Sequence, residues 1–206
     1  MKWPICPESL PYPIMIRSLC LTSTFALFTD FSSRLGPIVL AANTLHLRLI
    51  SLGAFFIDGA AFAVESLAGI FYGEGRRQTL DRLVGLALLT GAVFGILFSL
   101  IPVLFPAALF GLLTSHSEVI ELATALRWWL FPVLFVGSAA YIFDGLFLGL
   151  TAGPVLRNAM LLSVLVFLPP AIISITRGDT HLLWLSLSLF MIARVLTLAF
   201  AWKKLY

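Results

Sequence analysis

The strongest constraint on this chain is an apolar run of 37 residues, 37–73, that carries two acids in its interior. Asp58 and Glu65 are seven residues apart, so on a helix at about 100° per residue their directions differ by only about 20°. The same spacing, extended towards the N-terminus, meets Ser51 and Thr44. One face of the predicted helix is therefore polar, whereas the other faces carry leucine, isoleucine, phenylalanine and alanine.

Composition places this run in a membrane. Of the 206 residues, 60% are hydrophobic and 11% are charged, and the mean hydropathy is +1.04. Soluble domains average about 25% charged residues. We therefore predict an integral membrane protein without a separate soluble domain. The net charge of +3 is too small and too scattered to favour nucleic-acid binding.

Apolar segments of spanning length recur along the chain and predict an all-α bundle of six transmembrane helices. They lie at about residues 14–34, 37–73, 83–110, 124–150, 155–175 and 181–202. The second exceeds a span of about 20 residues, so it is expected to tilt, kink or protrude. Residues 1–13 hold four prolines and are expected to be non-helical, which leaves 14–203 as the six-helix lobe. The fifth helix is expected to end at Pro169 and Pro170.

The loops carry an uneven share of the basic residues, which predicts the orientation. One side collects eight: Lys2, Arg17, Arg76, Arg77, Arg82, Arg157, Lys203 and Lys204. The other side collects three: Arg34, Arg127 and Arg177. The excess predicts a multi-pass plasma-membrane protein with both termini in the cytoplasm. Four tryptophans near predicted span ends are interpreted as interfacial anchors: Trp128, Trp129, Trp184 and Trp202.

Small residues indicate where helices approach closely. Glycine pairs with i, i+4 spacing occur at Gly69 and Gly73, at Gly91 and Gly95, and at Gly145 and Gly149. Such pairs let helix backbones approach in lipid.

A further acid, Asp144, lies near the middle of the fourth predicted span. Tyr141 and Thr151 are expected to share its helical face. The sequences FIDGAAF at 56–62 and IFDGLF at 142–147 resemble each other, which hints at an internal repeat of the kind found in transporters.

The acids have two interpretations. In the first they only pack: Arg48 forms a static buried ion pair with Asp58 and Glu65, and Asp144 bonds Tyr141 or pairs with Arg194. Neutral isosteres would then be tolerated, because removing a buried charge removes its desolvation cost. In the second they form a proton- or ion-responsive site, since charges inside a membrane normally face a bundle interior or a wet cavity.

Other chemistries have no support in the sequence. It contains no His-Glu-x-x-His, Gly-x-Ser-x-Gly or P-loop motif, and its three histidines are scattered. Cys6 and Cys20 lack metal-ligand spacing and are interpreted as inert thiols. We therefore expect neither an enzyme nor a bound cofactor or metal.

Two long stretches together resemble the multidrug and toxic compound extrusion (MATE) family, and its DinF-like branch in particular. They are LAANTLHLRLISLGAFFIDGAAFAVESLAGIFYGEGRR and YIFDGLFLGLTAGPVLRNAMLLS. Members of that family have twelve spans in two six-helix lobes and export organic, often cationic, compounds in exchange for protons or sodium. The resemblance implies that this chain is the C-terminal lobe and that it associates with an N-terminal-half partner or with itself.

The resemblance also assigns roles to the acids. Asp144 falls where family members place an aspartate that serves the cation or proton site, and Asp58 and Glu65 match the DinF-like pattern on the eighth span. Some sodium-coupled members have a glutamate on the seventh span, whereas the corresponding SLCLTST here has none. The supporting polar residues are Tyr141, Arg48, Ser51, Thr44 and Arg194. We expect a proton-coupled drug antiporter. The alternative is a non-transporting membrane assembly or scaffold protein, or a decayed transporter fragment.

Overall fold

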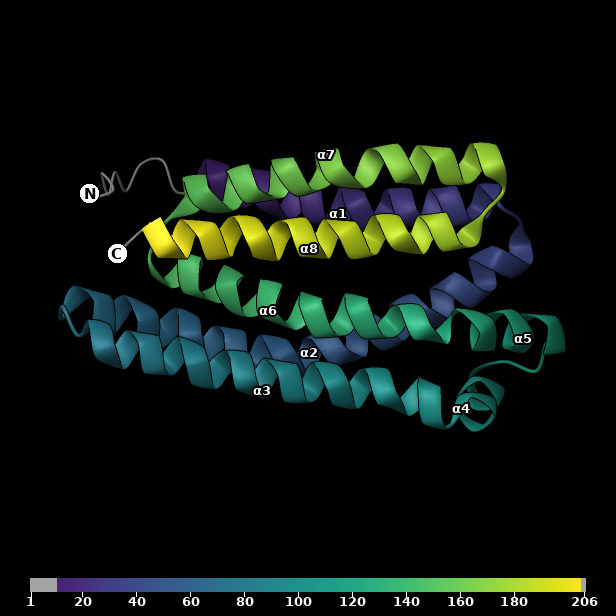
Figure 1. Cartoon of the computed structure of the whole chain (residues 1–206), viewed down its shortest axis with the longest axis horizontal. Coiled ribbons are helices and arrows are strands. Elements are labelled where there is room, and N and C mark those ends of the chain that lie inside the picture. The colour runs from purple at the N-terminus through teal and green to yellow at the C-terminus, as the bar shows by residue number, and fades with distance from the viewer. Residues whose placement is uncertain (1–10, 205–206) are drawn as a thin grey trace.

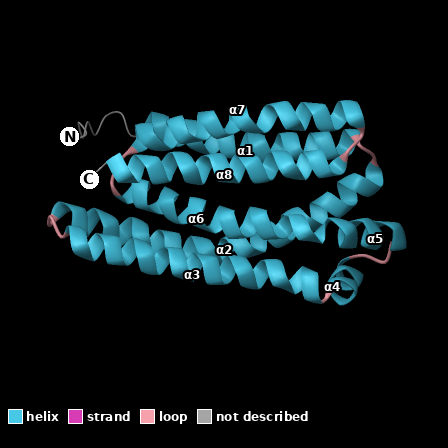
Figure 2. Cartoon of the chain, viewed as in Figure 1, coloured by secondary structure: helices cyan, strands magenta, loops and turns pink. Residues whose placement is uncertain are grey.

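The structure, a computed structural model, describes residues 11–204 and is helical throughout, without a strand in that range (Figure 2). Its long helices are α1 (Pro11–Arg34), α2 (Pro37–Gly73), α3 (Arg77–Leu104), α6 (Leu130–Gly149), α7 (Gly153–Arg177) and α8 (Thr180–Lys204). Two short helices, α4 (Pro106–Leu113) and α5 (Ser117–Leu126), and a 3₁₀ turn (Arg127–Trp129) connect α3 to α6. Within the described residues, six segments are long and apolar enough to cross a membrane. The predicted all-α bundle of six spans is confirmed.

The long helices form two groups of three (Figure 1). Helices α1, α7 and α8 pack together, and α2, α3 and α6 form the other group. Helix α6 also packs against α8, and α1 against α2, so these contacts join the groups. The start of α1 and the end of α8 lie at the same end of the bundle.

Prolines set several helix ends differently from the prediction. Helix α1 begins at Pro11, three residues before the predicted start, because a proline in the first turn removes an N–H that has no helical partner. Residues 1–10 of the predicted non-helical segment lie outside the described residues. The third predicted helix ends at Leu104, and Pro106 starts the separate helix α4. Helix α7 continues through Pro169 and Pro170 to Arg177, as membrane helices can.

The polar link predicted before the fourth span is partly helical. Helix α5 begins at Ser117 and continues through the 3₁₀ turn into α6, so one apolar segment extends over Ser117–Gly149. Glu118 in the first turn of α5 stabilises this helix start, since an acid near a helix N-terminus is favourable.

Glycines bring α6 close to its neighbours. A Cβ added to Gly145 or Gly149 would overlap the backbone carbonyl of Ala61 or Glu65 on α2. On α3, a Cβ at Gly95 would lie 2.9 Å from the carbonyl oxygen of Leu134. The predicted close approach is confirmed at these positions and at Gly69, where an added Cβ would lie 3.1 Å from the carbonyl oxygen of Gly149. It is wrong for Gly73, where an added Cβ would meet nothing within 4 Å.

Trp184 is a core residue and not an interfacial anchor. Its side chain is fully buried, and its Nε1 donates to Asn43 Oδ1 at 2.9 Å. Asn43 Nδ2 in turn donates to Ser32 Oγ at 2.8 Å. A buried indole with a satisfied N–H can take a core position because it leaves no polar group without a partner. These bonds join α8, α2 and α1.

Candidate functional site

Asp144 lies on α6, which packs against α8, and the side chain of Arg17 reaches it from α1. Its carboxylate is almost completely buried, and the same oxygen, Oδ2, accepts hydrogen bonds from two arginines. Arg17 of α1 donates from Nε at 2.7 Å and also from Nη2. Arg194 of α8 donates from Nη2 and is fully buried. Charge-assisted bonds of this kind are the strong ones, so this centre ties α6 of one group to α1 and α8 of the other.

The remaining hydrogen-bonding groups of this centre are partly unused. Asp144 Oδ1 is buried and has no hydrogen-bond partner among the described residues, and the same holds for Nε and Nη1 of Arg194. Buried polar atoms normally have partners, so each exception calls for an explanation. The second carboxylate oxygen is therefore the atom that is free to accept a proton.

Tyr141 contributes its ring to the centre. The Arg194 guanidinium carbon lies 5.2 Å from the centroid of the Tyr141 ring, which is a cation–π distance. Of the two partners predicted for Asp144, Arg194 pairs with it, whereas no hydrogen bond joins it to Tyr141 within residues 11–204. Thr151 does not share this face, because α6 ends at Gly149 and Thr151 is an exposed turn residue with φ +54°.

Asp58 of α2 is the second acid of the site. Its side chain is half-buried, and the charges of Arg17, Arg194 and Asp144 all act on it. It forms no ion pair within 4 Å in the described part of the chain. The site therefore combines two acids and two arginines, and its formal charge is zero when both acids are ionised.

The other predicted residues on α2 do not join this site. Glu65 lies seven residues beyond Asp58, about 10 Å further along the helix axis. Arg48 is exposed, and no ion pair with Asp58 or Glu65 is present in the described residues, so the predicted static pair is wrong. The hydroxyls of Thr44 and Ser51 donate to carbonyls one turn earlier, at 2.7 and 2.9 Å. Such bonds are local to the helix.

Arg17 is the residue that sequence reasoning missed. From the sequence it belongs with the cytoplasmic basic residues, because the first predicted span begins only three residues before it. With α1 beginning at Pro11, Arg17 lies six residues, or about 9 Å, inside the helix. The available signal was its isolation between the apolar residues of IMI and the mostly apolar SLCL, which is typical of an intramembrane charge with a partner.

No group of three or more metal-ligating His, Cys, Asp or Glu side chains occurs among residues 11–204. The arrangement is suited to moving a proton or exchanging ion-pair partners. It offers a buried carboxylate, Asp144, and a second carboxylate nearby, Asp58. The charges of the same two arginines act on both carboxylates.

Comparison with known proteins agrees with this architecture. The MatE family model matches residues 13–173. The DNA damage-inducible protein F of Escherichia coli (strain K12) is 31% identical over 191 residues, which cover 93% of this chain but 41% of that protein. This chain therefore spans about two fifths of the length of that relative.

Two solved transporter structures share the fold. A MOP superfamily transporter from Pyrococcus furiosus superposes with a TM-score of 0.78 at 19% identity, over 94% of this chain and 42% of that one. A mutant of the Vibrio cholerae MATE transporter VcmN superposes with a TM-score of 0.72, also at 19% identity, over 93% and 43%. By its match to the family model and its identity to the E. coli protein, this multi-pass membrane chain belongs to the MatE (multidrug and toxic compound extrusion) family and resembles its DinF-like branch.

Proposed function

We propose that the chain is the C-terminal six-helix lobe of an efflux transporter that exports small organic, often cationic, compounds in exchange for protons. The observation that carries this proposal is the buried centre of Arg17, Asp144 and Arg194, with Asp58 beside it. Membership of a transporter family supplies the class of activity. In this centre, protonation of Asp144 would change which helices are connected by ion pairs.

The proposed mechanism follows from the ion pairs. A proton taken from outside by Asp144 Oδ1 removes the charge that holds both guanidinium groups. Arg17 then interacts with Asp58, the remaining carboxylate on which its charge acts. The ion pair between α1 and α6 is thereby replaced by an ion pair between α1 and α2. If the two arrangements bind the organic compound with different affinity, proton uptake drives its release.

Protons fit this centre better than sodium does. A hard cation needs several oxygen ligands, and the oxygen of Asp144 that faces α1 and α8 is already occupied by guanidinium groups. Within the described residues, no third acid joins Asp144 and Asp58.

Asp58→Asn is expected to abolish proton-coupled efflux without unfolding the protein. Asp58 is half-buried and makes no ion pair in the described chain, so a neutral isostere breaks no direct ion pair, and Asp144 still accepts hydrogen bonds from both arginines. The measurement is ethidium efflux from proteoliposomes of a complete two-lobe transporter carrying this lobe, driven by a pH gradient or by a sodium gradient. We expect at least a tenfold loss with the pH gradient, and no drive from sodium in either protein.

Glu65→Gln is the matched control, because it neutralises an acid on the same helix about 10 Å from Asp58. It is expected to retain more than half of the efflux rate. Wild-type efflux by Asp58→Asn at wild-type abundance would contradict the proposed exchange of partners. An abundant, folded parent protein through which neither gradient drives ethidium would favour the alternative, a non-transporting assembly protein or a decayed fragment.

We also propose that α2 faces the second lobe, or a second copy of this chain. Its outward face combines the polar residues Arg48 and Ser51 with Phe55 and Phe62, which are 81% and 65% exposed. A face with a cation among aromatic residues suits a protein partner or a wet cleft better than lipid.

For the plasma-membrane orientation, we expect both termini in the cytoplasm. The start of α1 and the end of α8 lie at one end of the bundle, and the turn between α2 and α3 carries basic residues. In a variant with Cys6 and Cys20 replaced by serine, a cysteine at position 77 is expected to react only when the membrane is opened, and one at position 179 in intact cells. Labelling of position 77 in intact cells would reverse the orientation.

A further inference from the structure

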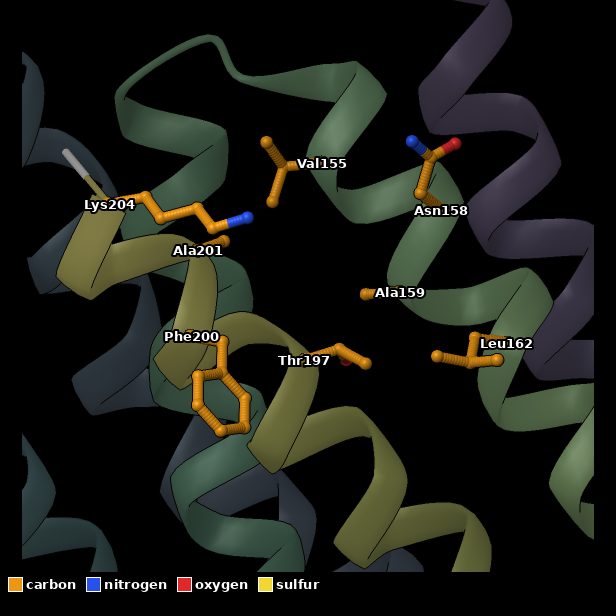
Figure 3. Close-up of a pocket in the computed structure, with 8 residues that line it drawn as sticks. All are labelled: Val155, Asn158, Ala159, Leu162, Thr197, Phe200, Ala201 and Lys204. Carbon is orange, nitrogen blue, oxygen red and sulfur yellow. The ribbon is translucent and has the colours of Figure 1, made fainter.

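We propose that a groove between α7 and α8 binds an anionic glycerophospholipid, with its phosphate at the mouth and an acyl chain along the wall. The groove has a volume of about 350 Å³ and opens on the surface of the bundle. Figure 3 shows its wall formed by apolar side chains of both helices, including Val155 and Leu162 of α7 and Phe200 of α8.

The lysine and the amide that line the groove lie at one end of it, and the remaining polar lining residue, Thr197, uses its hydroxyl within α8, where it donates to the carbonyls of Ala193 and Arg194 at 2.8 and 2.9 Å. Lys204 is the last residue of α8, and its ammonium group lies beside Ala201 at the mouth (Figure 3). Asn158 lies in the second turn of α7, at the same end of the bundle. Phe200 and Leu162 lie about one turn further along each helix, towards the middle of the span. This polarity matches an amphiphile whose head is at the membrane surface, and not an apolar molecule buried in lipid.

The charge at the mouth favours an anionic head. Arg157 donates from Nε and Nη2 to Asn158 Oδ1, at 3.1 Å each, so a second cation lies against a residue of the groove. No acid lines the groove. Basic pockets between membrane helices near the cytoplasmic surface are typical sites for phospholipid head groups. Lysine suits this position because its aliphatic stem lies on apolar surface while its ammonium reaches the head group.

The test uses the full chain in phosphatidylcholine vesicles with a trace of phosphatidylglycerol that carries a photoreactive acyl chain. We expect the cross-links to map to Leu162 and Phe200, and unlabelled phosphatidylglycerol to displace the probe more effectively than added phosphatidylcholine. Lys204→Gln is expected to weaken phosphatidylglycerol binding about fivefold, as the loss of one basic contact at an anionic surface predicts.

Lys203→Gln is the matched control, since Lys203 is an exposed neighbouring cation that does not line the groove. It is expected to change the binding less than twofold. A second variant, Ala201→Phe, fills the groove and is expected to remove the cross-links. Equal losses in the two lysine variants, equal displacement by both lipids, or cross-links spread evenly over the helices would overturn the proposal. If Ala201→Phe does not fold, the comparison of the two lysine variants decides. Lipid binding at this groove does not depend on transport.

Discussion

Gly145→Ala and Gly149→Ala are each expected to destabilise the bundle by about 3 kcal/mol, the upper end of the range for an overpacked core. The added methyl groups would overlap the backbone carbonyls of Ala61 and Glu65 on α2. A clashing side chain could change its rotamer, but a clash with a helix backbone is relieved only when the whole helix shifts. The two helices must therefore separate along the contact that also holds Asp58 near Asp144. We expect the proposed efflux, measured in a complete two-lobe transporter, to fall together with stability.

The measurement is the free energy of unfolding of the purified chain in mixed detergent micelles. Gly59→Ala is the control on α2, because an added Cβ there would meet nothing within 4 Å. It is expected to be neutral or to stabilise the helix by about 0.5–1 kcal/mol, since alanine loses less conformational freedom than glycine. Equal effects at Gly59 and Gly145 would show that helix propensity, and not the α2–α6 contact, governs stability.

These glycines show what a local pattern can and cannot predict. Spacing alone predicted a close approach at three pairs, and the structure confirms it at Gly145, Gly149, Gly95 and Gly69. The same spacing failed at Gly73, which ends α2 beyond the packed region. A glycine pair indicates that another helix can pack closely at that position. Which helix packs there depends on the tertiary arrangement of the bundle.

Helix number was predictable, because spanning helices need long apolar segments and the chain has six. The ends of the helices were less predictable, because the effect of a proline depends on its position in the helix. Pro11 and Pro106 lie in first turns, where a missing N–H costs nothing, whereas Pro169 and Pro170 lie inside α7. The sequence alone does not say which case applies.

For the site, the sequence identified the acids more readily than their partners. Asp144 and Asp58 stand out as carboxylates within apolar runs, and the structure brings both near the same arginines. The role of Arg17 could not be predicted, because it lies near the start of the first predicted span, where a basic residue is typical of a loop. Its partner lies 127 residues away, so only the three-dimensional arrangement, in which the Arg17 side chain extends from α1 to α6, reveals the pair.

The partners change what a neutral isostere at Asp144 should do. If the acid were a solitary packed group, Asp144→Asn would be tolerated. Asp144 is instead the shared acceptor of Arg17 and Arg194, and Arg194 is fully buried. Removing one member of a buried ion pair leaves an uncompensated charge, at a cost of about 3–5 kcal/mol. We therefore expect Asp144→Asn to lower the free energy of unfolding by about that amount and to abolish efflux.

A double variant separates the structural part of this effect from the coupling part. Adding Arg194→Gln to Asp144→Asn removes the fully buried cation, while Arg17, whose side chain is 17% exposed, can turn towards solvent or Asp58. We expect the double variant to recover most of the lost stability, because a buried ion pair replaced on both sides no longer carries a desolvation cost. Ethidium efflux should remain absent, because no carboxylate is left on α6 to exchange Arg17 with Asp58. Recovered efflux together with recovered stability would show that Asp144 holds the helices in place and that the proton is carried elsewhere.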